Sequence, residues 1–151
     1  MRPTFVLDVV GLTPALLGEN TPNISRVLAR GGMRPLREVL PAVTATVQST
    51  FVTGEPPSGH GCVANGWYFR ELSEVLMWRQ SNKLVAGEKV WEAGRRRDPA
   101  FTCAKLFWWY NMYSSADYTV TPRPMYPADG RKLPDVYTQP AGLREQLSTR
   151  L

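Results

Sequence analysis

The sequence predicts an α/β fold, in which helices flank a mostly parallel sheet. Two apolar runs, residues 5–10 and 101–110, are rich in β-branched and aromatic residues, as buried strands are. Segments with helical spacing of their apolar residues follow the first run at 24–30 and precede the second at 88–97. Strands that alternate with helices in this way are typical of a parallel sheet, whose functional edge lies at the strand C-termini.

The N-terminal part of the chain predicts a strand–helix–strand unit. The helix at 24–30 ends before a Gly-Gly pair, and residues 33–40 form a second extended segment. Pro35 makes this segment an edge strand or an irregular one. Asp8 lies inside or at the end of the strand at 5–10. A carboxylate in that place is costly unless it is paired or binds a metal.

A hydroxyl-rich segment in residues 41–65 predicts a short helix that begins at Thr44 and ends at Gly54. Apolar residues recur there at every fourth position, namely Val43, Val47 and Phe51. A threonine at a helix start faces unpaired backbone N–H groups and the positive end of the helix dipole. Thr44 could therefore help to hold an anion such as phosphate, or it could serve only as the helix cap.

The remaining sequence predicts shorter elements. Two aromatic-rich runs in residues 66–79 indicate an antiparallel hairpin, and residues 118–121 a brief strand. Residues 125–140 are rich in turn signals. From residue 142 the spacing of leucines predicts a helix that has no stop signal before the last residue. We therefore expect the chain to be cut off inside or just after a helix.

Composition indicates a globular protein of 151 residues, with 43% apolar and 21% charged residues and a net charge of +5. The basic cluster at 95–97 ends a predicted helix, so we interpret it as a solvated helix end rather than a nucleic-acid site. Cys62 and Cys103 form neither a metal-binding pair nor a disulfide framework. Since no segment has the pattern of a signal peptide or a membrane span, we expect a cytoplasmic protein with reduced thiols.

The motifs between residues 8 and 65 resemble the start of the alkaline phosphatase superfamily. The closest branch is the type I phosphodiesterase/nucleotide pyrophosphatase group, which includes phosphonoacetate hydrolase. An apolar strand carries Asp8, a helix leads from Thr44 to a V-T-G string, and a P-x-x-H-G turn containing His60 precedes Asn65. The separations between these residues also agree with that group.

This resemblance implies a metal-dependent hydrolase of phosphate esters, acting on a phosphodiester or pyrophosphate bond. It implies two divalent metal ions, foremost Zn²⁺, that clamp the attacking and leaving oxygens. Thr44 would be the nucleophile, forming a covalent phospho-threonine, and also a metal ligand. Asp8 would be a second metal ligand, and Asn65 would donate a hydrogen bond to a phosphate oxygen. His60 corresponds to a residue that is not a ligand in this group, so we interpret it as structural.

The sequence departs from the family pattern in two places. Two valines follow Asp8 where the family usually has glycine. The residue after the nucleophile is Ala45, whereas nucleotide-cleaving members often have an aromatic residue that stacks on the base. Trp67 and Tyr68 could take over that stacking, or they could be core residues. Nucleotide preference therefore stays open.

The sequence also lacks most of the ligands that a two-metal site needs. It contains one histidine, and the later aspartates have no histidine beside them. We therefore predict that residues 1–151 are the N-terminal portion of an alkaline phosphatase-like catalytic domain, with an inserted hairpin near 66–79. The small-molecule phosphate ester would bind at the nucleophile half of the site. The alternatives are a phosphonate C–P hydrolase of the same superfamily and a catalytically incomplete binding or interaction module.

Overall fold

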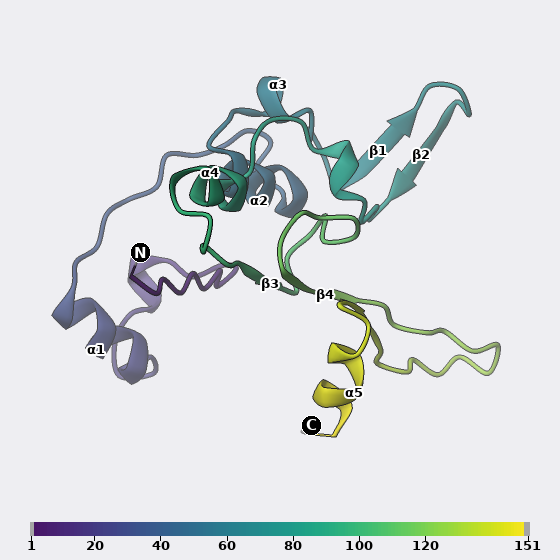
Figure 1. The fold of residues 1–151 in the computed structure, drawn as a ribbon. Coiled ribbons are helices and arrows are strands. Elements are labelled where there is room, and N and C mark those ends of the chain that lie inside the picture. Colours follow the sequence, from purple (N-terminus) through teal and green to yellow (C-terminus); the bar gives the residue numbers. More distant parts are fainter. Residues whose placement is uncertain (1, 150–151) are drawn as a thin grey trace. The chain divides into compact units, whose positions relative to one another are not determined.

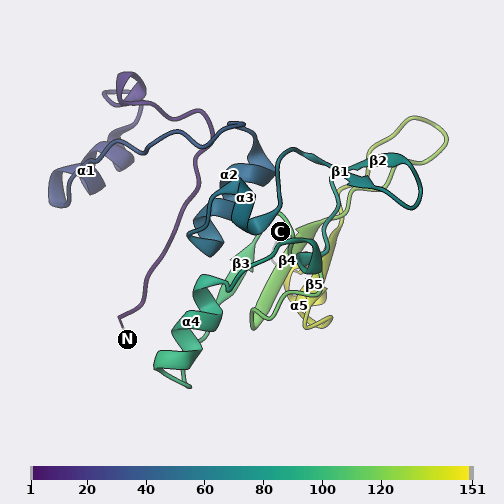
Figure 2. The same ribbon diagram turned by 90° about the horizontal axis from the view of Figure 1, so that it is seen from above.

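The computed structural model describes residues 2–149. The chain divides into two compact units, with bounds Met1–Arg37 and Glu38–Leu151. Each unit is described by itself, and Figures 1 and 2 label the elements from two directions. That residues 1–151 form one portion of a catalytic domain stays a prediction. Among the described residues, no helix has both the length and the apolar character needed to cross a bilayer.

The N-terminal unit is helical where it is regular. It contains the 3₁₀ helix η1 (Pro14–Leu16) and the predicted helix, α1 (Pro22–Arg30), and proline occupies the first turn of both. The strands predicted at 5–10 and 33–40 are wrong: the described part of this unit contains no strand. A strand needs a partner for its backbone hydrogen bonds, and an apolar sequence does not supply one. Phe5 is accordingly 84% exposed.

The helices of the C-terminal unit begin and end at local signals. They are α2 (Thr44–Thr53), α3 (Pro57–His60), the 3₁₀ helix η2 (Asn82–Leu84), α4 (Val90–Arg97) and α5 (Leu143–Ser148). The predicted start of α2 at Thr44 is confirmed, and so is its end at Gly54. Gly54 has φ 71°, a left-handed conformation that glycine adopts without strain. The three arginines predicted at a helix end lie in the last turn of α4.

The predicted hairpin is confirmed, as β1 (Gly66–Phe69) pairs antiparallel with β2 (Glu74–Met77). Figure 1 shows it extending from the rest of this unit. Trp67 lies opposite Leu76 on a face that is partly buried. Tyr68, on the other face, is 57% exposed. The hairpin therefore packs through the side that carries Trp67.

A second sheet contains β3 (Ala104–Leu106), β4 (Tyr118–Pro122) and β5 (Val136–Gln139), side by side in Figure 2. β3 pairs parallel with β4, and β5 pairs antiparallel with the other edge of β4. The α/β class is therefore correct, but the described residues do not bear out a mostly parallel sheet. β5 lies in the stretch predicted to be turns, because its strand state depends on pairing with β4.

The hydrophobic core of the C-terminal unit lies beside the start of α2. Its buried members are Ala45, Cys62, Val85 and Tyr110, and the rings of Trp67 and Trp109 pack against them. Helix α2, the hairpin and the segment after β3 each contribute to this cluster. The residue after Thr44 is thus a core residue, which fixes the first turn of α2 in place.

Candidate functional site

Thr44 is the first residue of α2, and the extended residue before it turns the chain into the helix. That residue, Val43, has φ −118° and ψ 157°. The amides of the first helical turn have no partner within the helix, and they lie at the positive end of its dipole. Thr44 is partly buried there. Its hydroxyl therefore lies at a helix end suited to an anion.

Asn65 lies next to this helix end. Its Oδ1 accepts a hydrogen bond of 2.9 Å from the backbone N–H of Ala45. The structure thus brings Thr44 and Asn65 together, although 20 residues separate the two bonded groups in sequence. The Nδ2 group of Asn65 carries two N–H donors of its own. The side chain can therefore hold the helix with its oxygen and donate to a ligand with its nitrogen.

His60 is a structural residue, as predicted. It is fully buried, and its Nδ1 accepts a 3.1 Å hydrogen bond from the backbone N–H of Cys62. The imidazole is therefore neutral, with its proton on Nε2, which donates to Thr50 Oγ1 at 2.9 Å. Burial lowers the pKa of His60 below 6.5, and the nearby Glu55 only partly opposes this shift. With both nitrogens engaged, the ring is not available to bind a metal.

The β3–β4 connection, residues 107–117, packs against α2 one turn beyond Thr44. Gln48 Oε1 accepts a 2.9 Å hydrogen bond from the backbone N–H of Trp109. The indole N–H of Trp108 donates to the Gln48 carbonyl at 3.4 Å, and its ring meets Phe51 edge-on at 6.5 Å. These contacts fix the connection to the helix that carries Thr44.

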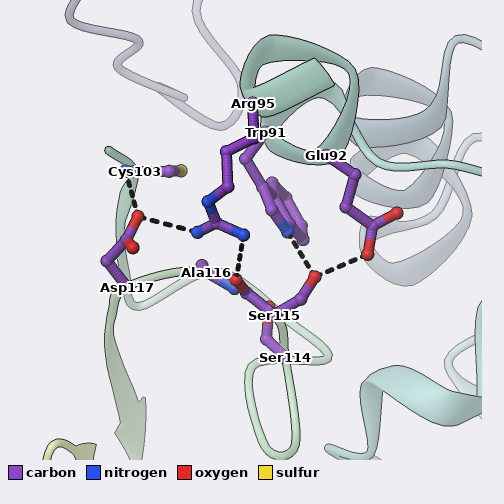
Figure 3. A network of polar contacts seen from close by, with 8 residues as sticks. All are labelled: Trp91, Glu92, Arg95, Cys103, Ser114, Ser115, Ala116 and Asp117. Atoms are coloured by element: carbon purple, nitrogen blue, oxygen red, sulfur yellow. Dashed lines mark hydrogen bonds and ion pairs between the residues drawn. The ribbon is translucent and has the colours of Figure 1, made fainter. Parts of the chain in front are cut away.

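A second polar network joins α4 to the same connection (Figure 3). The indole N–H of Trp91 donates to Ser115 Oγ at 2.8 Å, and that hydroxyl donates to Glu92 at 2.5 Å. Arg95 donates to the Ser115 carbonyl at 2.6 Å. Ser115 therefore uses both its side chain and its backbone to bind the helix.

Asp117 completes this second network. Its Oδ2 accepts hydrogen bonds from the Cys103 backbone N–H at 2.7 Å and from Arg95 at 2.8 Å. The hydrogen bond from the Cys103 amide is the main cause that lowers the pKa of Asp117, and the bond from Arg95 lowers it further. The carboxylate is thus ionised and engaged, and it holds the start of β3 against α4.

Lys105 is a buried charged residue that sequence reasoning missed. Its buried amine donates to the carbonyls of Trp109 and Tyr110 at 2.9 and 3.0 Å, and it lies 5.1 Å from the Trp91 ring centre. Burial is the main cause that lowers its pKa to about 7. No sequence signal marks it, because it is one lysine in an aromatic strand. Its bonds make it a brace for the β3–β4 connection.

The described residues do not supply the full ligand set of the two-metal site that the resemblance implies. Asp8 lies exposed in the N-terminal unit. The described residues contain no group of three or more His, Cys, Asp or Glu side chains that could hold a metal ion. Three aspartates that follow Thr44 in the sequence form ion pairs with arginine: Asp117, Asp129 and Asp135. Asp8 and Thr44 as metal ligands therefore stay predictions.

Comparison with known proteins gives one family. A family model described as type I phosphodiesterase / nucleotide pyrophosphatase matches residues 4–150. The matched range includes Asp8, Thr44 and Asn65. No curated protein and no solved structure was found to match the chain.

Proposed function

Because the chain belongs to the type I phosphodiesterase/nucleotide pyrophosphatase family of the alkaline phosphatase superfamily, we propose that it hydrolyses a phosphodiester or pyrophosphate bond with Thr44 as nucleophile. Members of this family act on small phosphate esters. The observation that carries the proposal is the hydrogen bond from Ala45 N–H to Asn65 Oδ1. It sets an amide side chain beside the threonine at the start of a ten-residue helix.

The chemistry that these residues support is phosphoryl transfer to a hydroxyl. Thr44 Oγ forms a bond to phosphorus while the bond to the leaving oxygen breaks, and the leaving oxygen takes up a proton. Water then attacks the phosphorus of this threonine adduct, which still carries the substrate's other ester group; a phosphate monoester is released and the hydroxyl is restored. The helix N-terminus favours the negative charge of the phosphate, and the Asn65 amide donates to a non-bridging oxygen.

Two divalent metal ions remain part of this proposal, with Asp8 and Thr44 as two of their ligands. The described residues do not supply the other ligands, so no step is derived through the ions. Zinc titration of the chain by calorimetry tests this part. Binding of two ions per chain contradicts the alternative of an incomplete binding module, whereas the absence of binding favours it.

The substrate is proposed to be a small molecule, and the location cytoplasmic. The location rests on Cys62 and Cys103, both of which are free thiols in the structure. A panel of phosphodiesters, pyrophosphates and phosphonates tests the substrate class. Cleavage of a C–P bond in preference to a P–O bond would favour the phosphonate hydrolase.

The nucleophile is tested by a pair of substitutions. Thr44→Ala removes the attacking oxygen, so we expect metal-supplemented turnover of an aryl phosphodiester to fall by about 10³-fold or more. Thr44→Ser keeps a hydroxyl and should retain measurable turnover. Mass spectrometry of quenched protein should find the phosphoryl group, with the substrate's remaining ester group, on residue 44 of the unsubstituted chain. Turnover that survives Thr44→Ala would exclude this mechanism.

A further inference from the structure

A cleft in the C-terminal unit lies on the β5 side of the three-stranded sheet, and two arginines line it. Its volume is about 340 Å³. Arg123 follows the end of β4 and Arg144 belongs to α5, and the two meet in the cleft with residues of β5. Figure 2 shows α5 next to β5. No residue that lines this cleft takes part in the candidate site at Thr44.

Asp135 fixes the backbone of one arginine and the side chain of the other. Its carbonyl accepts a 2.8 Å hydrogen bond from the backbone N–H of Arg123. Its Oδ1 accepts a bond of 2.9 Å from Nε of Arg144 and one of 2.8 Å from the N–H of Val136. The bond from Arg144 is the main cause that lowers the pKa of Asp135, so the carboxylate is ionised at neutral pH. The Arg144 guanidinium is therefore oriented by an ionised partner in the cleft wall.

The charges that line the cleft do not balance. Two guanidinium groups accompany a single carboxylate, and no other charged side chain lines the cleft. The charge of Arg123 helps to lower the pKa of Asp135, but its side chain has no hydrogen-bond or ion-pair partner among residues 2–149. All the N–H donors of that guanidinium are therefore available to a ligand. With one positive charge in excess, the cleft suits an anion.

We propose that the cleft binds an oxyanion, the phosphate or carboxylate group of a small molecule, between the guanidinium groups of Arg123 and Arg144. A planar guanidinium matches such a group because it donates two parallel N–H bonds to two oxygens. Asp135 holds Arg144 before a ligand arrives, so less side-chain entropy is lost on binding. Val136 and Tyr137 add apolar lining, which accommodates the carbon part of the ligand. This site does not depend on the proposed role of Thr44.

NMR titration of the ¹⁵N-labelled whole chain with sodium phosphate, sodium acetate and sodium chloride, at matched ionic strength, tests the cleft. We expect phosphate, acetate or both to shift the Nε signals of Arg123 and Arg144, and chloride to leave them in place. Arg123→Gln keeps the backbone N–H that binds Asp135 but removes the guanidinium. It should weaken binding by about tenfold, the size of one charge-assisted contact.

Two further variants show whether the guanidinium itself is responsible. Arg123→Lys keeps the charge but loses the planar pair of donors, so it should weaken binding less than Arg123→Gln does. Arg131→Gln is the matched control, because that side chain is 69% exposed and lies outside the cleft. It should bind the anion as the unsubstituted chain does.

The outcomes separate a specific site from the general attraction of anions to a basic chain. Tighter binding of phosphate than of acetate assigns phosphate compounds as ligands, and the reverse assigns carboxylic acids. The proposal is overturned if neither anion shifts the two Nε signals, or if chloride shifts them equally. It is also overturned if Arg123→Gln and Arg131→Gln weaken binding to the same extent. An inactive chain that binds the anion here would reject the proposed hydrolysis alone, whereas an active chain without these shifts would reject only the cleft.

Discussion

Helices α2 and α4 each bind the β3–β4 connection through a polar network, but the two networks differ in how completely their groups are paired. At α4, the Ser115 hydroxyl bonds the side chains of Trp91 and Glu92, and Arg95 bonds Asp117 and the Ser115 carbonyl. In α2, the hydroxyls of Thr46 and Ser49 are buried without a hydrogen-bond partner among the described residues. A fully paired network stabilises the fold, whereas unpaired groups leave capacity for a ligand.

The largest expected effect in this comparison is that of the Asn65 side chain, which binds the start of α2. Asn65→Ala should lower kcat/KM for a phosphodiester by about 10²- to 10³-fold, since it removes the proposed donor to the phosphate. It should lower the free energy of unfolding by only about 1 kcal/mol, the usual cost of a lost helix cap. Steady-state kinetics and urea unfolding measure the two effects.

Asn65→Asp sharpens this test. The carboxylate still accepts from the Ala45 N–H, so the stability of the fold should be close to that of the unsubstituted chain. It cannot donate to a phosphate oxygen, and it places negative charge beside an anionic substrate. Activity that survives Asn65→Asp would limit Asn65 to holding the helix.

The α4 network is expected to affect stability alone. Asp117→Ala leaves the Arg95 guanidinium and the Cys103 amide without their acceptor, so we expect a loss of about 2 kcal/mol in the free energy of unfolding. The Arg95 and Asp117 side chains are 29% and 32% exposed, so solvent screens the pair only in part. Urea unfolding measures this loss, and kcat of the folded protein should not change.

The ion pair between Arg96 and Glu88 provides the matched control on the same helix. These side chains are 67% and 43% exposed. Glu88→Gln should therefore change the free energy of unfolding by less than about 0.5 kcal/mol. If Glu88→Gln and Asp117→Ala lower the free energy of unfolding equally, the α4 network stabilises the fold no more than an exposed ion pair does.

A pH-dependent effect is expected at the far end of α2, where His60 binds Thr50. The pKa of His60 lies below its ordinary 6.5 in the fold, so the folded chain binds fewer protons than the unfolded chain as the pH falls below 6.5. His60 therefore contributes full stability above pH 6.5 and less below it. The free energy of unfolding should fall by at most about 1.4 kcal/mol per pH unit from this group.

Unfolding in urea at pH 7.5 and pH 5.5 measures this dependence. His60→Gln should be less stable at both values and should lose part of the difference between them. Lys105, with a pKa of about 7, also titrates in this range, so the His60 contribution is the part of the difference that the substitution removes. A variant with the same pH dependence as the unsubstituted chain would show that the buried imidazole is not its source.

Local signals account for the part of the fold that was predicted correctly. The start of α2 at Thr44 and its end at Gly54, the hairpin and α4 follow from residue spacing and turn chemistry over a few positions. The strand predicted at 5–10 failed, and β5 was missed, because both depend on whether another strand pairs with the segment. Apolar composition alone does not decide that.

The candidate site divides in the same way. The sequence by itself determined a helix that begins at Thr44, because capping and dipole effects act within one turn of the chain. Only the tertiary structure decided that Asn65 binds the Ala45 amide and that Lys105 is buried as a brace. Each of these contacts joins segments separated by loops, and only packing of the whole unit determines which distant groups meet.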